Sequence, residues 1–293
     1  MKINKSFTRL MAYLSVLCVV TLTVPVGYAS AQVCTPNPPQ ALSWWPGDGN
    51  TGDVVGGQHG GLEGTAAFGP GKVAQAFQFD GSGWFGIPDR PVWTLGTHDF
   101  TIELWAKFNN LTGLDPLIAH TDGGGPQNKW IFWYNSTGHD RLLGVPALRF
   151  MTENITPPAG TGIPHDIVVA PWNPVTGQWY HLAVTRSGNT FRLYINGSQV
   201  AVDTSSAELP DPTVPLTIGR AEAFTLKGMI DEPAIYNRAL TTQEISDISS
   251  AGSAGKCKPI ISVPEYNRTA GAMAVVVGVG VIVFVRKRLD HTI

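Results

Sequence analysis

The sequence has little of what characterises several large protein classes. Only 14% of its 293 residues are charged, and only three are cysteine. The 20 Lys and Arg are outnumbered by 22 Asp and Glu, and six of those bases lie in 1–31 and 286–288, so the body between is acidic. Nucleic-acid binding needs a basic surface, and we therefore expect no nucleic-acid partner. The 33 Gly and 22 Pro are too few for a collagen-like or low-complexity chain, and nine Trp exclude disorder as the main state.

A secretory signal peptide is predicted for residues 1–31. Three bases precede the apolar run 10–24, and the small residues of Ala29-Ser30-Ala31 match what a signal peptidase accepts. A retained membrane helix is the alternative, but the apolar run is short for that role. We expect cleavage before Gln32 and a mature chain outside the cytoplasm.

A second membrane signal lies near the end of the chain. Residues 270–285 are apolar and uncharged, and three bases follow at 286–288. This run is just below the roughly 17–25 residues of a spanning helix, but flanking Arg and Lys side chains can reach the headgroups. The positive-inside rule places the basic tail 286–293 in the cytoplasm and the large body outside. The sequence therefore predicts a single transmembrane anchor at the cell envelope or cell surface.

The short linker 258–269 adds a second interpretation of this tail. Its Val263-Pro264-Glu265, followed by an apolar run and a basic cluster, resembles the bacterial PEP-CTERM sorting tail. The signature of that family is Val-Pro-Glu-Pro, and Tyr266 replaces the last Pro here. A plain single-span anchor is the alternative to processing by a sorting enzyme.

Two cysteines remain in the mature chain, Cys34 and Cys257, because Cys18 belongs to the signal peptide. In an oxidising compartment two cysteines most simply form one disulfide. Free thiols or a metal pair are the alternatives, but neither cysteine has a CxxC partner or a nearby His. The pair brackets almost the whole body, so we expect the two edges of one domain to meet.

The body has the period-two pattern of β-strands, interrupted by Gly, Pro, Asn and Asp. The turn signals Gly188-Asn189 and Asn196-Gly197 predict an antiparallel meander of strands at 179–186, 190–195 and 198–203. Further strands are expected at 73–80, 100–107, 129–135, 147–151, 214–219 and 226–236, with the inner face of the second made of Phe100, Ile102, Leu104 and Ala106. Only 241–250 has a helical pattern, with Thr241 or Thr242 as N-cap and Glu244 near N3. This order of elements predicts a two-sheet antiparallel sandwich.

Several motifs follow one another in a fixed order: 42–50 (LSWWPGDGN) with Asp53, 56–60, 71–81, 100–107, 179–184, 193–197, 216–220, 228–232 and 236–240. Together they resemble bacterial LamG-like (laminin-G type 3, concanavalin A-like) domains. The resemblance covers residues 40–257 and implies an all-β, two-sheet antiparallel jelly-roll sandwich. Pro233 stands where the family has an apolar residue that donates a ladder bond, which implies a bulge or an edge there. The segment 152–173, with four Pro, is expected to be an irregular loop.

Enzymes of the superfamily that the sequence resembles cleave glucans with two carboxylates on one strand face. No Glu-x-Asp-x-x-Glu cluster is present, Glu103 is alone in its strand, and the adjacent Asp231 and Glu232 would point to opposite faces. No HExxH or GxSxG motif occurs either. His181, in an apolar strand, is expected to be packed and hydrogen-bonded. We therefore expect no enzymatic activity.

The same resemblance implies a Ca²⁺ ion that links the first strand region to the last. Asp231 would offer its carboxylate, with Asp48 and Asp53 of the Gly-rich early loop as further ligands. The alternative is that Asp48 and Asp53 shape turns and that Asp231 pairs with an Arg.

Aromatic side chains are the second kind of candidate binding feature. Trp84, Phe85 and Trp93 lie in Gly- and Pro-rich sequence, and sugar rings commonly stack on such side chains. The alternative is that these aromatics, like those of 130–134, pack in the core or at its edge.

Taken together, these features predict an exported, membrane-anchored, non-catalytic carbohydrate-binding or adhesion module with a polysaccharide or glycoprotein as partner. A structural envelope or matrix protein without a small ligand is one alternative, and a polysaccharide hydrolase or lyase is another, because fold alone does not fix function.

Overall fold

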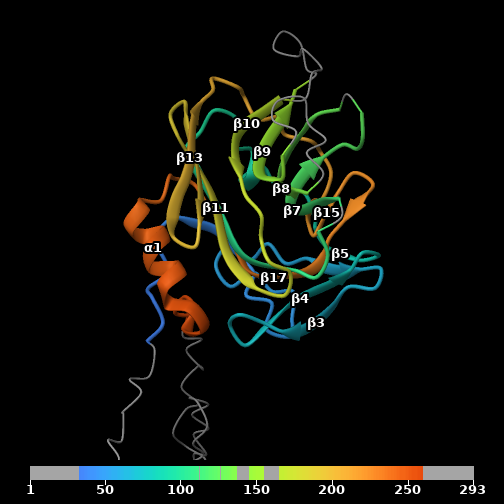
Figure 1. The fold of residues 1–293 in the computed structure, drawn as a ribbon, viewed down its shortest axis with the longest axis vertical. Coiled ribbons are helices and arrows are strands. Elements are labelled where there is room, and N and C mark those ends of the chain that lie inside the picture. The colour runs from blue at the N-terminus through green and yellow to red at the C-terminus, as the bar shows by residue number, and fades with distance from the viewer. Residues whose placement is uncertain (1–32, 112, 126, 137–144, 155–164, 260–293) are drawn as a thin grey trace, which may run out of the picture.

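The computed structural model describes residues 33–259, except 112, 126, 137–144 and 155–164. Within these residues the chain forms two large antiparallel sheets, a small hairpin and one α-helix (Figure 1). This is the predicted all-β two-sheet antiparallel sandwich, consistent with a jelly roll. The expected signal peptide 1–31 and the apolar run 270–285 lie outside the described residues. In the described part of the chain, no helix is long and apolar enough to cross a membrane.

The first sheet has eight strands in the order β13-β12-β11-β6-β17-β4-β3, with β1 paired to β17 beside this path. The predicted meander is confirmed, since β11, β12 and β13 pair in sequence. Asn196 and Gly197 have φ angles of 51° and 81° at its second turn. The strands are β1 (Ala41–Trp44), β3 (Ala67–Pro70), β4 (Gln75–Asp80), β6 (Phe100–Phe108), β11 (Trp179–Ser187), β12 (Thr190–Ile195), β13 (Ser198–Thr204) and β17 (Lys227–Tyr236).

The second sheet has seven strands in the order β10-β9-β8-β7-β14-β5-β2. The segment expected to be an irregular loop contains one of them, β10, which pairs with β9 and buries Ile167, Val168 and Ala170. The strands are β2 (Gly61–Glu63), β5 (Trp84–Ile87), β7 (Leu114–Thr121), β8 (Lys129–Asn135), β9 (Ala147–Glu153), β10 (His165–Pro171) and β14 (Leu216–Ile218), and the separate hairpin is β15 (Arg220–Ala221) with β16 (Phe224–Thr225).

The hydrophobic core lies between the two sheets. The predicted inner face of β6 is confirmed, because Phe100, Ile102, Leu104 and Ala106 are all fully buried in this core. Phe77 of β4 and Phe85 of β5 stack across the core with ring centroids 4.5 Å apart. Full burial of such a side chain contributes about 1.5–3 kcal/mol, so these inner faces hold the sheets together.

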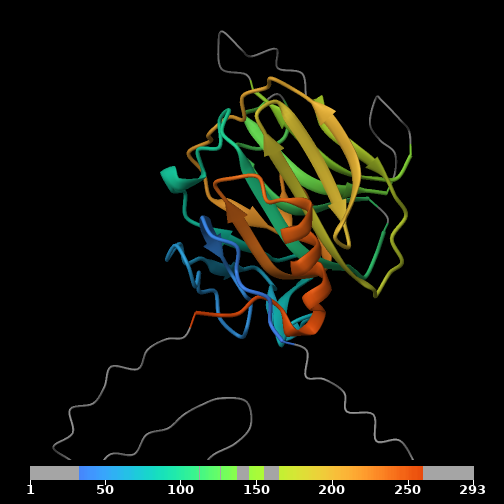
Figure 2. The same cartoon turned by 90° about the vertical axis from the view of Figure 1, so that its left-hand side faces the viewer.

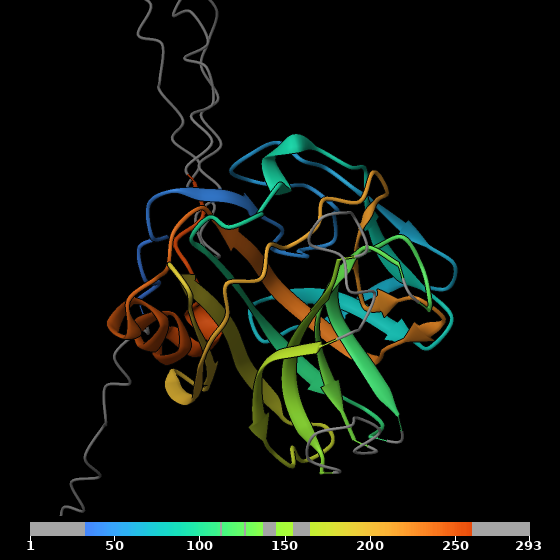
Figure 3. The same ribbon diagram turned by 90° about the horizontal axis from the view of Figure 1, so that it is seen from above.

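The outer face of the eight-stranded sheet is covered by α1 (Thr242–Ala251), as Figures 2 and 3 show. The helix begins with the predicted capping box, in which the Thr241 side chain accepts from the Glu244 amide and the Glu244 carboxylate accepts from the Thr241 amide. Its Ile245 and Ile248 join a buried cluster with Trp44 of β1. A side chain on this face is therefore shielded from solvent where the helix lies.

The bulge that Pro233 implies is present in β17. Its pairing with β6 shifts register between Asp231 and Ala234, and Glu232 takes a φ of 58°. Proline cannot donate to the ladder, so the strand bends out at this point and resumes pairing at Ala234.

The two edges of the domain meet, as expected from the cysteine positions. Cys34 and Cys257 form a disulfide with their Cα atoms 4.9 Å apart. The backbone pairs beside the bond, with Thr35 donating to the Gly255 carbonyl and Cys257 donating to the Thr35 carbonyl. Both ends of the described domain therefore lie on one side of the molecule (Figure 1). Short 3₁₀ helices at Pro91–Trp93 and Gly252–Ala254 complete the fold.

Candidate functional site

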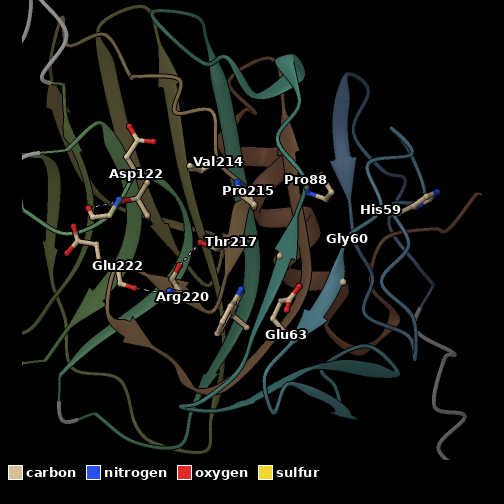
Figure 4. A pocket seen from close by; sticks show the side chains of 15 residues that line it. His59, Gly60, Glu63, Pro88, Asp122, Val214, Pro215, Thr217, Arg220 and Glu222 are labelled. Atoms are coloured by element: carbon tan, nitrogen blue, oxygen red, sulfur yellow. Dashed lines mark hydrogen bonds between the residues drawn. The ribbon is translucent and has the colours of Figure 1, made fainter.

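A trough crosses the outer face of the seven-stranded sheet, perpendicular to its strands (Figure 4). Its floor is one row of paired residues on four strands, because Gly61 of β2 faces Gly86 of β5, Gly86 faces Thr217 of β14, and Thr217 faces Ala119 of β7. Two of the four have no side chain, and the others are small. The row therefore leaves a cavity of about 620 Å³ above the sheet.

The glycines of the floor are not required by packing. A Cβ atom added at Gly61 would have no neighbour within 4 Å, and one added at Gly86 would contact Glu63 and Trp84 at 3.6 Å. Glycine weakens a strand interior, and it often marks a place where another molecule approaches the backbone closely. The space over Gly61 and Gly86 is open, so another molecule can approach the backbone there.

One wall of the trough is formed by Glu63, Trp84 and Arg220. Glu63 of β2 is the strand partner of Trp84 of β5, so both project beside the floor. The Arg220 guanidinium lies 4.0 Å from the Trp84 ring centroid in a cation–π contact. Thr217 donates from its hydroxyl to the Arg220 carbonyl at 2.7 Å, which fixes the chain where it leaves β14. The wall thus offers an oriented aromatic ring, a carboxylate and a guanidinium.

The opposite wall is made mainly by residues two positions along the chain from the four floor residues. Its side chains are small or compact and leave the cavity wide: His59, Pro88, Val214, Pro215 and Thr121.

The trough is closed at the β7 end by the β15–β16 hairpin. Ala221 of the hairpin is buried together with Ala119, Ile131 and Met151, so it covers the continuation of the floor row over β7, β8 and β9. Glu222, at the tip of the hairpin with a φ of 56°, forms an ion pair with Lys129 of β8.

Lys129 fixes the hairpin in place. Its ammonium also donates to the Gly125 carbonyl at 2.8 Å and lies 3.2 Å from a Glu153 carboxylate oxygen. Asp122 lies at the same end of the trough as Glu222, as Figure 4 shows. The closed end is therefore acidic and rigidly built.

The structure places the three predicted aromatic ligands in different environments. Trp84 is partly exposed and lines the trough, whereas Phe85 and Trp93 are fully buried. Strand alternation explains Phe85, because its neighbours Trp84 and Gly86 face outward and it faces the core. Trp93 packs beside Trp45 with ring centroids 6.3 Å apart. Neither buried ring is open to a ligand in solution.

Of the three predicted calcium ligands, Asp48 and Asp231 both interact with the Lys258 ammonium, whereas Asp53 is hydrogen-bonded within the early loop. Both carboxylate oxygens of Asp53 accept backbone amides, among them those of Trp44 at 3.0 Å and Gln58 at 2.9 Å, so this residue shapes the early loop. Asp48 accepts the Gln75 amide at 3.1 Å and forms an ion pair with Lys258. These bonds tie both Asp53 oxygens to the backbone of the early loop and its neighbouring strand.

Asp231 is fully buried, and one of its oxygens accepts the Val73 amide at 2.8 Å. Burial raises its pKa to about 8, which disfavours the charged form. The bulge at Glu232 overturns the expectation that Asp231 and Glu232 point to opposite faces, because both carboxylates interact with the same Lys258 ammonium. That ammonium lies 3.6 Å from a Glu232 oxygen, where a cation would be needed. Among the described residues, no group of three or more His, Cys, Asp or Glu side chains could hold a metal ion.

A polar network on the outer face of the eight-stranded sheet adjoins this cluster, because Lys256 donates to the Glu232 carbonyl at 3.2 Å. The His181 ring lies 3.0 Å from the Glu103 carboxylate, and Lys256 forms an ion pair with the same carboxylate. Burial raises the pKa of Glu103, but the Lys256 ammonium and the His181 ring outweigh it and hold that pKa below its usual value. His181 is thus packed and hydrogen-bonded, as predicted. All three side chains are almost completely buried, so the network ties Lys256 to the sheet and does not face solvent.

Most of the trough was not found from the sequence. Glycines inside the strand-forming stretches of β2 and β5 were the available signal, but it acquires meaning only when the register places them side by side. The other residues that the prediction missed come from separate strands and loops: Glu63, Arg220, Glu222 and Asp122.

Known proteins resemble this chain in sequence and in fold. A family model described as the concanavalin A-like lectin/glucanases superfamily matches residues 79–246, more than half of the chain. Pappalysin-1 from Mus musculus is 36% identical over 85 residues, a match that covers 26% of this chain and 5% of that protein. The chain thus corresponds to a small part of the length of that relative.

Two solved structures illustrate the fold. Domain 4 of AbnA, a GH43 extracellular arabinanase from Geobacillus stearothermophilus solved in complex with arabinotriose, superposes with a TM-score of 0.56 at 20% identity, covering 71% of this chain and 97% of that one. The binding domain of botulinum neurotoxin DC, in complex with SialylT, gives 0.53 at 15% identity, covering 73% and 52%. At these identities the likeness is one of fold, and it agrees with the family match. The chain belongs to the concanavalin A-like lectin/glucanases superfamily.

Proposed function

We propose that this protein is an exported, non-catalytic carbohydrate-binding domain whose ligand lies in the trough. The observation that carries the proposal is the open floor of Gly61 and Gly86 beside the partly exposed ring of Trp84. A cavity of about 620 Å³ is within the range of roughly 300–1,000 Å³ that small-molecule sites occupy.

The lining suits the two-sided chemistry of a sugar. The apolar faces of a pyranose or furanose ring pack against the Trp84 indole, whose orientation is held by Arg220. Sugar hydroxyls donate to carboxylates such as Glu63 and accept from the guanidinium, and hydrogen bonds to charged groups are the stronger kind. Glycine floors let the ring approach the backbone.

The fold neighbours support a carbohydrate ligand. The AbnA domain was solved with arabinotriose, and the botulinum neurotoxin DC binding domain was solved with SialylT. Both belong to other proteins, and they support the class of ligand rather than its identity.

The positions of the titratable carboxyl groups support a role without catalysis. Glycoside hydrolysis uses a carboxylic acid with a raised pKa beside the scissile bond. Burial raises the pKa of Asp115 and Glu232 to about 7 and that of Asp231 to about 8, but none of these three residues lines the trough. Among the described residues, these three raised-pKa carboxyl groups thus lie outside the trough, which supports a binding role there.

The disulfide between Cys34 and Cys257 supports export to an oxidising compartment. Membrane anchoring through residues 270–285 stays a prediction from the sequence.

The binding test combines a glycan array with calorimetry on two matched tryptophan variants. Trp84→Ala should weaken binding by roughly 10- to 100-fold, because a central aromatic anchor contributes about 1–3 kcal/mol. Trp179→Ala is the control, since Trp179 is also partly buried with a cation, Lys107, 5.1 Å from its ring, but belongs to the other sheet. Equal losses for both variants would contradict the assignment of the trough.

A third variant fills the trough without removing a contact. Gly61→Val places its side chain in open space over the floor, and valine suits a strand, so the domain should unfold at the same or higher denaturant concentration. Binding should be lost. Retained binding would show that the ligand lies elsewhere.

A further inference from the structure

We propose that the trough holds the end of an uncharged glycan chain, with the terminal sugar against Asp122 and Glu222 and the rest of the chain leaving over the β2 edge. This inference rests on the proposed function and adds which part of a glycan, and which charge class, the site accepts.

The first argument is the asymmetry of the two ends. At β7 the floor row stops, because Ala221 covers Ala119 and its neighbours, and Glu222 is held across this end by its ion pair with Lys129. At the opposite end β2 is the last strand of the sheet, and beside it lie the exposed His59 and Gly60, which donates its amide to the Thr51 carbonyl of the early loop. A chain can leave over β2, but it cannot continue past the hairpin.

The second argument is what the closed end presents. Asp122 is exposed, both Asp122 and Glu222 line the trough, and Lys129 contacts only one of the two Glu222 carboxylate oxygens. Carboxylates accept hydrogen bonds only. The terminal residue of a glycan has a free hydroxyl where an internal residue has a bridging oxygen, so it alone offers an additional donor there.

The third argument is charge. The lining carries three carboxylates, on Glu63, Asp122 and Glu222, against one guanidinium on Arg220. The nearby ammonium of Lys129 is already shared between Glu222 and Glu153. Acidic sugars would bring like charges within the screening length of about 8 Å at physiological salt, which disfavours them. A neutral chain meets no such repulsion.

Calorimetry with length series of linear oligosaccharides tests end recognition. The probes are neutral arabino-, xylo- and cello-oligosaccharides from the trisaccharide to the octasaccharide. The expected result is one protein per oligosaccharide at every length, because only one of the two ends of a chain fits the closed end. A stoichiometry that rises with chain length would overturn end recognition while leaving carbohydrate binding intact. Absence of binding to every neutral oligosaccharide and to the parent polymers would instead overturn the proposed function.

An oligogalacturonate series of the same lengths tests the charge argument. The unmodified protein should bind it at least tenfold more weakly than its best neutral probe, and the double variant Glu63→Gln, Asp122→Asn should narrow that difference severalfold. Asp203→Asn, which removes one exposed carboxylate from the edge strand β13 of the other sheet, is the control and should leave the difference unchanged. Equal binding of acidic and neutral probes, or an unchanged preference in the double variant, would overturn the charge selection.

Discussion

Asp115 carries a carboxyl group that burial keeps protonated to an unusually high pH. It lies in β7, is 6% exposed, and has one carboxylate oxygen without a hydrogen-bond partner among the described residues. Loss of hydration raises its pKa to about 7. The folded state therefore holds this proton between about pH 4 and pH 7, where the unfolded state has released it, so folding stability falls as pH rises through that window.

Replacing Asp115 removes this dependence. Asp115→Asn keeps the size of the side chain and cannot ionise. Between pH 4 and 7 the free energy of unfolding of the unmodified protein should fall by up to about 1.4 kcal/mol per pH unit because of Asp115, and the variant should lack this contribution. Urea unfolding at several pH values measures the difference between the two proteins. Parallel curves would mean that Asp115 is ionised in the folded state.

We predict that Lys258 controls the response to calcium. Its ammonium already neutralises Asp48 and lies close to Glu232, so we expect Ca²⁺ to leave the melting midpoint of the unmodified protein unchanged. Lys258→Met removes that charge, and Ca²⁺ should then stabilise the folded variant. The free energy of unfolding should rise by about 2.7 kcal/mol at a Ca²⁺ concentration one hundred times Kd. Thermal melts with Ca²⁺ and with chelator measure the midpoints of the unmodified protein and of the variant. A midpoint of the unmodified protein that rises with Ca²⁺ would instead support the site that the family resemblance implies.

At the scale of the element, α1 depends on its first turn. The Thr241 hydroxyl accepts from the Glu244 amide, and Arg238 binds the Glu244 carboxylate through two nitrogens, at 2.9 and 2.6 Å. Thr241→Ala should lower the free energy of unfolding by about 1 kcal/mol. Denaturant unfolding measures this loss, with Thr213→Ala, an exposed threonine outside any helix or strand, as the control. Equal effects of the two substitutions would mean that the cap does not stabilise the helix.

Elements with a strong local pattern could be predicted, and short ones could not. The alternation in β6, the turn at Asn196-Gly197 and the capping box of α1 are each determined by a few neighbouring residues, and all three were confirmed. By contrast, β2 has three residues and β15 two, too short for any periodicity. They form because the sheet or hairpin partner supplies the hydrogen bonds, which the local sequence does not encode.

The trough was only partly predictable for the same reason. The sequence predicted both Trp84 and its neighbour Phe85 as ligand-binding residues. Two adjacent residues of a strand face opposite sides, and the sequence alone does not tell which of the two aromatics faces outward. That choice depends on the register of β5 with β2 and β14. The disulfide was predictable, because two cysteines in the mature chain leave one pairing.

At the scale of the whole molecule, the disulfide is the main long-range constraint. Cys34 and Cys257 are 223 residues apart, and closing a loop of that size contributes at most about 5 kcal/mol in the chain-entropy treatment. Replacing both cysteines with alanine should therefore lower the melting midpoint by up to about 20 °C, with a smaller loss where backbone pairing persists. Differential scanning calorimetry measures the shift, and thiol titration of the unmodified, denatured protein should detect no free thiol in residues 32–293. An unchanged midpoint would mean that the backbone pairing alone holds the edges together.

The same bond has a mechanical consequence. Because Cys34 and Cys257 are covalently joined at one side of the sandwich, tension applied between residues 33 and 258 passes through the sulfur atoms and leaves both sheets unloaded. Pulled in this way, the oxidised domain cannot lengthen by unfolding the chain between the two cysteines, whose sequence separation is 223. Reduction would allow the same domain to unfold and lengthen under load, so the redox state of one bond sets the extensibility of the chain between residues 33 and 258.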